Sequence, residues 1–371
     1  MKILVAPNSF KECSDSVNIS NMIYENLKTK LKDKIILAPI SDGGDGFTEV
    51  CNYYFKGRRL TYTISRPYDN STFECEIFYS NDTGTVFIES ANVLGLKIIP
   101  AKYRNPLLLS SKGIGEILRF LEKGAFPIEK VIVGIGGTGT IDMGLGACSV
   151  FGFNLFDKNM KELKIIPENF SKAVSIQWVK HNSPFRIKFV IDVNNPLIGE
   201  NGAIRVFGKQ KGADENAMAT LESGFSNILN LLNDKQLLGS SKQLSGAGGG
   251  IPAGFRILFN SSNMDANNFI LNNLGLKDKI EKADIIIIGE GSFDSQSIMG
   301  KGAGIILNEA LKLRKDIVLI CGKVEEKLKS SLGKNVKYFE LQSYFNNTEE
   351  SIKNYKTGIE KACEELVEML K

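Results

Sequence analysis

The segment spanning residues 130–147 limits the fold of this chain more than any other stretch of the sequence. Residues 131–133 are consecutive β-branched side chains, which is typical of a strand buried on both faces of a sheet. Glycines follow at positions 134, 136, 137 and 139, and the next residues fit the first turns of a helix. Such a junction presents backbone N–H groups and the positive end of the helix dipole to an anion. The segment therefore predicts an α/β fold with an anion-binding loop.

Several other apolar segments of strand length also end in acidic or polar loops. These segments are residues 3–6, 35–38, 185–191, 285–288 and 317–320. Their alternation with helical patterns at both ends of the chain indicates a parallel α/β sheet. Ligands of open α/β sheets bind beyond the carboxyl ends of the strands, so we expect the acidic residues of these loops to surround one cleft. They are Asp42, Asp142, Asp192, Glu290 and Asp294.

Carboxylates at this density suit Mg²⁺, a hard cation that takes oxygen ligands and binds substrate phosphates. Three lysines, Lys11, Lys211 and Lys301, could balance the negative charge. Any one of them taken alone is more simply explained as a solvated surface residue.

The chain of 371 residues suits two domains rather than one core. Residues 58–90 contain short strand patterns joined by polar turns, which indicates an antiparallel element and a change of domain. We therefore expect a Rossmann-like α/β domain with a parallel sheet, formed by residues 1–68 and 268–371. An inserted mixed α/β domain at 69–267 would carry the glycine-rich loop, with a cleft between the two.

Composition excludes several classes of protein. The net charge of +4, with both signs interspersed, gives no basic patch of the kind that binds nucleic acid. No apolar run approaches the ~20 residues that a membrane span needs. The six scattered cysteines form no C-x-x-C pair, which indicates reduced thiols and a cytoplasmic location. The only histidine, His181, would have to carry any Ser-His-Asp triad or histidine metal site alone.

The glycines at 134, 136 and 139 also match the G-x-G-x-x-G pattern of dinucleotide-binding loops. Asp157 falls near the distance at which an acid would bind the ribose. This pattern keeps an NAD-dependent oxidoreductase open as an alternative. Against it, such a loop usually opens its domain, and the acidic loops at Asp42, Asp192 and Glu290 would have no role.

Several motifs together resemble the bacterial glycerate kinases that form 2-phosphoglycerate. The matching stretches are residues 6–11, 41–46, 134–138, 192–197, 207–213, 289–291, 294–296 and 300–301. They occur in the order of the family over nearly the whole chain. The resemblance implies transfer of the γ-phosphoryl group of ATP to a hydroxyl of D-glycerate with Mg²⁺. It implies a small-molecule substrate and is compatible with a homodimer.

The chain departs from the pattern of that family at a few positions. Asn8 and Asn194 stand where the family usually has Asp. Ile141 and Met143 replace Asn and Gly, Ser292 replaces Arg, and Lys209 replaces Pro. The two asparagines keep a further alternative open, which is a non-catalytic ligand-binding relative.

We assign roles by combining the loops with the resemblance. The loop at 134–140 would bind the phosphates of ATP, through Gly134, Gly136, Gly137 and Thr138, with Asp142. Asp192 would orient or deprotonate the attacking hydroxyl, and Lys11 and Asp42 would assist catalysis. Asp42 and Glu290 would hold Mg²⁺. The remaining substrate-binding candidates are Ser9, which would hold the glycerate carboxylate with Lys11, and Asn194, Asp294 and Lys301.

Overall fold

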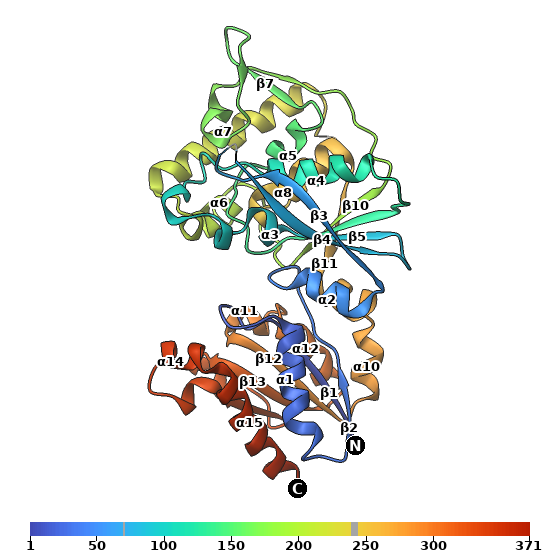
Figure 1. Cartoon of the computed structure of the whole chain (residues 1–371). Coiled ribbons are helices and arrows are strands. Elements are labelled where there is room, and N and C mark those ends of the chain that lie inside the picture. The colour runs from blue at the N-terminus through green and yellow to red at the C-terminus, as the bar shows by residue number, and fades with distance from the viewer. Residues whose placement is uncertain (70, 239–243) are drawn as a thin grey trace. The chain divides into compact units, whose positions relative to one another are not determined.

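The computed structural model describes residues 1–69, 71–238 and 244–371, which form two compact units (Figure 1). Unit 1 consists of Met1–Tyr54 and Asp265–Lys371, and unit 2 consists of Phe55–Met264. The sequence places the first domain boundary after residue 68, whereas the first break between the units follows Tyr54. The reason is that β3 (Gly57–Ser65) pairs with β4 (Thr72–Ser80) along its whole length and so belongs to unit 2.

Unit 1 contains a sheet of five parallel strands in the order β14-β13-β12-β1-β2. The strands are β1 (Lys2–Pro7), β2 (Lys34–Leu37), β12 (Ile285–Phe293), β13 (Asp316–Val324) and β14 (Val336–Glu340). Counted along unit 1, this is the doubly wound order 2-1-3-4-5, in which the chain reverses direction across the sheet between β1 and β12. Ligands of such sheets bind beyond the carboxyl ends of the two strands at that switch point.

Helices cover both faces of this sheet. The helices α1 (Ser16–Lys28) and α15 (Tyr355–Leu370) lie side by side on one face, where Ile19 and Leu366 join Val5 of the sheet in one core (Figure 1). The helices α10 (Leu276–Lys282) and α12 (Ala303–Lys312) pack on β1 and β12. The shorter helices of the unit are α2 (Phe47–Tyr54), α9 (Ala266–Asn268), α11 (Ser295–Ile298), α13 (Glu326–Lys329) and α14 (Thr348–Lys353).

Unit 2 contains a six-stranded mixed sheet in the order β11-β10-β6-β5-β4-β3. Its further strands are β5 (Thr85–Glu89), β6 (Lys130–Gly134), β10 (Arg186–Ile191) and β11 (Ser262–Asp265). The strands β5, β6 and β10 are parallel, and β3, β4 and β5 form an antiparallel meander. A separate antiparallel sheet consists of β7 (Asn154–Phe156), β8 (Glu162–Leu163) and β9 (Ser175–Gln177).

The helices of unit 2 pack on the mixed sheet and on one another. They are α3 (Ser90–Leu94), α4 (Lys112–Glu122), α5 (Leu145–Ser149), α6 (Ala203–Phe207), α7 (Glu215–Asp234) and α8 (Ala247–Phe259). The predicted fold class, α/β with one parallel sheet and one mixed sheet, is confirmed. None of the helices in the described residues is long and apolar enough to cross a membrane.

Candidate active site

Three of the sequence-predicted loops of unit 1 meet at the carboxyl ends of its central strands. Asn8 follows β1, and its backbone N–H donates to the carbonyl oxygen of Gly289 in β12 at 2.8 Å. The side-chain amide of Asn8 donates to Oδ2 of Asp42 at 3.4 Å, and its Oδ1 accepts from the N–H of Ser9 at 2.9 Å. The loops after β1 and β2 are therefore tied to each other at the switch point of the sheet.

Gly302 marks the position where the polar side chains of this cluster converge. A Cβ on Gly302 would lie 2.6 Å from Oε2 of Glu290, 2.8 Å from Nδ2 of Asn8 and 3.6 Å from Oδ2 of Asp42. The φ of Gly302 is +51°, so a side chain here would be strained as well as crowded. Glycine at this position therefore leaves room for the cluster formed by Asn8, Asp42 and Glu290.

Glu290 is a half-buried residue of this cluster, and the Oε1 atom of its carboxyl group is buried. Burial, together with the negative charges of Asp42 and Asp294, raises its pKa to about 8. Hydrogen bonds to the side chain of Ser297 and the backbone of Ala303 oppose that rise. Its Oε1 is buried without a hydrogen-bond partner among the described residues. A buried carboxylate oxygen without a partner is costly, so an incoming donor or cation would stabilise it.

The donor set of this cluster fits Mg²⁺ in kind but supplies only part of a coordination shell. Its oxygen atoms are the ligands that Mg²⁺ prefers. In the part of the chain that the structure describes, no group of three or more His, Cys, Asp or Glu side chains is placed to hold a metal ion. Two carboxylates from the protein leave the remaining positions to water and substrate phosphates, which is the usual arrangement for Mg²⁺ in kinases.

The other predicted residues of unit 1 lie near this cluster with local contacts of their own. Asp294 caps α11, because its Oδ1 accepts from the N–H groups of Gln296 at 2.8 Å and Ser297 at 3.3 Å. Lys301 Nζ donates to the side-chain oxygen of Gln296 at 3.0 Å. Ser9 is half-buried and Lys11 is exposed. Asp294 thus has a structural role that explains its presence without a substrate.

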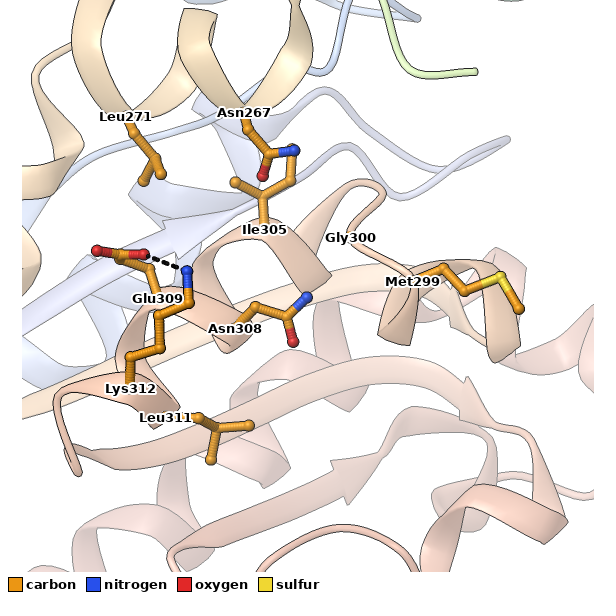
Figure 2. Close-up of a pocket in the computed structure, with 9 residues that line it drawn as sticks. All are labelled: Asn267, Leu271, Met299, Gly300, Ile305, Asn308, Glu309, Leu311 and Lys312. Carbon is orange, nitrogen blue, oxygen red and sulfur yellow. Dashed lines mark hydrogen bonds and ion pairs between the residues drawn. The ribbon is translucent and has the colours of Figure 1, made fainter. Parts of the chain in front are cut away.

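A separate pocket in unit 1 has a volume of about 580 Å³. Gly300, which precedes Lys301 in the chain, is one of the residues that line it. Figure 2 shows Asn267 and Leu271 facing Ile305 of α12 across it, with Asn308 on the same helix. The ion pair between Glu309 and Lys312, at 3.1 Å, lies at its edge. None of the predicted site residues is among the described residues that line this pocket.

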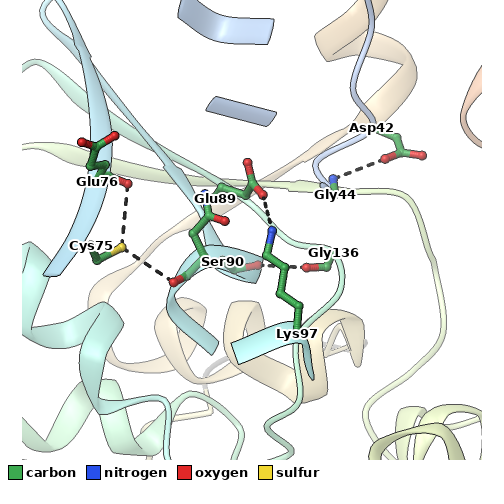
Figure 3. Close-up of polar contacts among 9 residues, drawn as sticks. Asp42, Gly44, Cys75, Glu76, Glu89, Ser90, Lys97 and Gly136 are labelled. Carbon is green, nitrogen blue, oxygen red and sulfur yellow. Dashed lines mark hydrogen bonds and ion pairs between the residues drawn. The ribbon is translucent and has the colours of Figure 1, made fainter. Parts of the chain in front are cut away.

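The glycine-rich loop of unit 2 is held by hydrogen bonds with residues 90–96. The N–H of Gly139 donates to the carbonyl oxygen of Leu94 at 2.7 Å, and the N–H of Leu96 donates to the carbonyl oxygen of Gly137 at 3.2 Å. The hydroxyl of Ser90 donates to the carbonyl of Gly136 at 3.4 Å (Figure 3). Among the described residues, the N–H groups at positions 136–138 have no protein acceptor. Consecutive unused N–H groups after a strand suit the binding of a phosphate.

Asp142 lies behind this loop rather than on its surface. The side chain is fully buried, and its Oδ2 accepts from the N–H and hydroxyl of Ser111 at 2.7 and 2.8 Å. The N–H groups of Gly144 and Gly146 complete its contacts at 3.1 and 3.2 Å. Burial raises the pKa of Asp142, and these hydrogen bonds oppose the rise. These contacts give the carboxylate of Asp142 a structural role in holding the segment that follows the loop, and its assignment to cofactor binding stays a prediction.

Asp192 and Asn194 follow β10, the neighbour of β6. These strands are parallel with Val190 opposite Gly134, and the carbonyl of Val190 accepts from the N–H of Ile135 at 3.0 Å. Asp192 is half-buried and Asn194 is exposed. Both residues therefore lie at the edge of the sheet that carries the glycine-rich loop, as the sequence predicts.

Two further residues lie beside the glycine-rich loop: Glu89, which had no assigned role in the predicted site, and Lys211, which was expected only to balance negative charge. Glu89 ends β5 opposite Gly134, is only 2% exposed and pairs with Lys97 at 3.4 Å (Figure 3). Lys211 is 8% exposed and donates to Oγ1 of Thr138 at 3.1 Å and to the carbonyl of Thr140 at 3.0 Å. A carboxylate directly after a buried strand was the available signal for Glu89. No pattern in the sequence shows that Lys211 is buried.

The residues that differ from the family pattern are partly buried in the core of unit 2 and partly exposed on the surface. Ile141 and Met143 are fully buried in the apolar core of unit 2. Met143 has a φ of +56°, a left-handed conformation that favours the glycine of the family, and its burial offsets that strain. Ser292 is exposed on β12 with Lys323 as its neighbour on β13, and Lys209 is exposed and pairs with Glu215 at 2.9 Å.

The structure does not support the dinucleotide-binding alternative. In a dinucleotide-binding unit the strand after the glycine loop and its helix joins the same parallel sheet. Here that strand is β7, which belongs to the separate antiparallel sheet. Asp157 closes a turn there by accepting from the N–H groups of Asn159 and Lys161, both at 2.9 Å. The histidine, His181, pairs with Glu122 of α4, so its contacts are structural as well.

The second glycine cluster, at 246–250, lets α8 approach the back of the loop. A Cβ on Gly249 would lie 2.1 Å from the carbonyl oxygen of Thr140 and 2.8 Å from Cα of Ile141, and its φ is +73°. We expect Gly249→Ala to lower the free energy of unfolding by about 3 kcal/mol, from overpacking and left-handed strain. Urea denaturation would measure this.

Gly152→Ala is the matched control for that variant. Gly152 also has a positive φ, of +89°, but nothing lies within 4 Å of the position that a Cβ would occupy. Gly152→Ala should lower the free energy of unfolding by about 1 kcal/mol, from left-handed strain alone. Equal destabilisation by the two substitutions would show that contact with the loop has no part in the effect.

Comparisons with known proteins agree with this arrangement. Residues 3–371 match the model of the glycerate kinase family. Glycerate 2-kinase of Escherichia coli (strain K12) is 32% identical over 88% of this chain and 86% of its own length. Glycerate kinase of Bacillus cereus is 32% identical over 87% of this chain and 86% of its own length. A crystal structure described as a glycerate kinase 2 of Salmonella typhimurium LT2 aligns with a TM-score of 0.79 and 26% identity, covering 100% of this chain and 98% of that one. The chain therefore belongs to the glycerate kinase family.

Proposed function

We propose that this chain transfers the γ-phosphoryl group of ATP to a hydroxyl of D-glycerate and so forms 2-phosphoglycerate. The observation that carries the proposal is the loop after β6, whose N–H groups at 136–138 have no acceptor among the described residues, at the sheet edge that also carries Asp192. Family membership supports the reaction class, and a relative named glycerate 2-kinase supports the product.

In unit 2, the loop would bind the phosphates of ATP through its backbone N–H groups. Gly134, Gly136, Gly137 and Thr138 form this loop. Asp192 would accept the proton of the attacking hydroxyl or orient it, and Asn194 would bind the substrate. Phosphoryl transfer needs little more than such positioning and charge stabilisation from a protein.

In unit 1, Asp42 and Glu290 would hold Mg²⁺ beside the amide of Asn8. The bound ion would neutralise charge on the phosphate oxygens. Ser9 and Lys11 would bind the carboxylate of glycerate by a hydroxyl and an ammonium group. Lys301 and Asp294 would bind the substrate, and Asp294 also caps α11. A homodimer and a cytoplasmic location stay predictions from the sequence.

The test is a coupled assay for ADP release with ATP, Mg²⁺ and D-glycerate, with phosphorus NMR of the product. The expected result is glycerate-dependent ADP release and a 2-phosphoglycerate signal. A 3-phosphoglycerate signal would keep the kinase and contradict the predicted position. Binding of ATP, seen as thermal stabilisation, without turnover of glycerate would favour the non-catalytic relative that Asn8 and Asn194 suggest.

A further inference from the structure

Lys211 is the buried cation of unit 2 that lies against the glycine-rich loop. It ends a 3₁₀ turn, Lys209–Lys211, and Gly212 follows with a φ of +94°. This turn directs the side chain of Lys211 to Thr138 and Thr140, whereas Lys209 is exposed and pairs with Glu215. Neighbouring lysines of one turn thus have opposite environments.

Near Lys211, two kinds of polar group lack a full set of hydrogen bonds among the described residues: the ammonium group itself and the hydroxyl of Thr140. An ammonium group has three N–H donors, and two of them bond to Thr138 and Thr140. The hydroxyl of Thr140 is buried and has no hydrogen-bond partner in the described part of the chain. A buried polar group without a partner costs free energy, and one in a candidate site points to a missing ligand.

The charges that face Lys211 are few. Asp142 is the carboxylate that acts on it, and the N–H groups of 111, 144 and 146 already fill the oxygens of that carboxylate. Arg104 approaches the following residue, Gly212, through its backbone. Burial lowers the pKa of Lys211 to about 7, and the charge of Asp142 only partly opposes this. The buried amine therefore lacks a full counter-ion.

We propose that Lys211 is a positioning residue that orders the loop through Thr138 and Thr140 and supplies the positive charge behind its N–H groups, so that the loop binds a phosphate-bearing ligand with Lys211 in its ammonium form. This inference rests on the proposed function, because it takes the ligand to be ATP. An anion on the loop is the counter-ion that the buried ammonium lacks.

Proton uptake is the direct consequence. Above about pH 7 the free protein holds much of Lys211 as the neutral amine, because its pKa lies near that value. Binding an anion stabilises the ammonium form, so the protein must take up a proton as ATP binds. The affinity for ATP should therefore fall as the pH rises above 7, by up to about tenfold per pH unit.

The experiment is calorimetric titration of the unmodified protein with ATP at about pH 8, where the γ-phosphate of ATP is already ionised. Two buffers with different ionisation enthalpies give the number of protons exchanged. We expect uptake approaching one proton per ATP. A titration with D-glycerate in place of ATP should show none. Binding of ATP without proton uptake would overturn the inference and needs no substitution to be informative.

Three substitutions separate charge from packing. Lys211→Arg keeps a permanent cation, so proton uptake should vanish while binding of ATP persists. Lys211→Met removes the charge, and KM for ATP should rise by about 10- to 100-fold, more than kcat falls. Lys209→Met, on the exposed side of the same turn, should change neither. Equal effects of the Met substitutions at 209 and 211 would contradict the assignment.

This inference and the proposed function can fail separately. ATP binding with proton uptake but no turnover of D-glycerate would keep the role of Lys211 and overturn the glycerate kinase reaction. Turnover of D-glycerate without proton uptake would overturn only the role of Lys211. No binding of ATP at all would overturn both.

Discussion

Asp192→Asn should lower kcat by about 100-fold or more with a much smaller change in KM for ATP. The reason is that Asp192 follows β10 at the sheet edge that carries the loop, so a carboxylate there can act on a hydroxyl beside the phosphates. Asparagine keeps the size of the side chain but cannot accept a proton. Steady-state kinetics with D-glycerate and ATP would measure both constants.

Glu200→Gln is the matched control for this prediction. Glu200 lies on the same connection after β10 and is exposed, so neutralising it should leave kcat unchanged. An Asp192→Asn variant with the kcat of the unmodified protein would remove Asp192 from the chemistry. A loss of kcat that follows the loss of thermal stability would point to structure rather than to proton transfer.

The fold could be predicted where the pattern of side chains is local. The four isoleucines at 285–288 lie in the buried part of β12, and the run at 131–133 lies in β6. A strand buried on both faces has few alternatives, so such runs identify parallel sheets. The boundary expected after residue 68 differs from the break after Tyr54, because Ile64 is the one buried residue of β3 and the pairing of β3 with β4 decides which unit it joins.

For the candidate site, the sequence predicts where the loops lie better than it predicts the role of each side chain. The rule that ligands bind beyond strand ends located the loops of Asp42, Glu290, Asp192 and the glycines. It could not show that the carboxylate of Asp142 is fully buried and bonded to Ser111. Burial depends on distant segments, and for this reason the sequence named Lys211 only as a cation that could balance charge and did not show that it is buried against the loop.

The second large effect concerns Mg²⁺. Asp42→Asn should lower kcat/KM by about 100-fold or more at limiting Mg²⁺, with partial recovery at high Mg²⁺, if Asp42 is a ligand. Asp42 and Glu290 are the two carboxyl groups that approach Gly302, so Asp42→Asn removes one of the two acidic ligands offered to a cation. Activity measured against Mg²⁺ concentration would separate a weaker metal site from a defect that no concentration repairs.

Asn8→Asp should change the affinity for Mg²⁺ in the direction opposite to Asp42→Asn. The amide of Asn8 lies 3.4 Å from Oδ2 of Asp42, so a carboxylate there would add a third negative group to the cluster. The Mg²⁺ concentration for half-maximal activity should fall by roughly three- to tenfold, because affinity for hard cations rises with the number of charged ligands. The substitution should also destabilise the metal-free protein, since like charges would face each other without a cation. A shift of both variants in the same direction would mean that Asp42 and Asn8 affect folding alone, and the assignment of this cluster to Mg²⁺ would then be wrong.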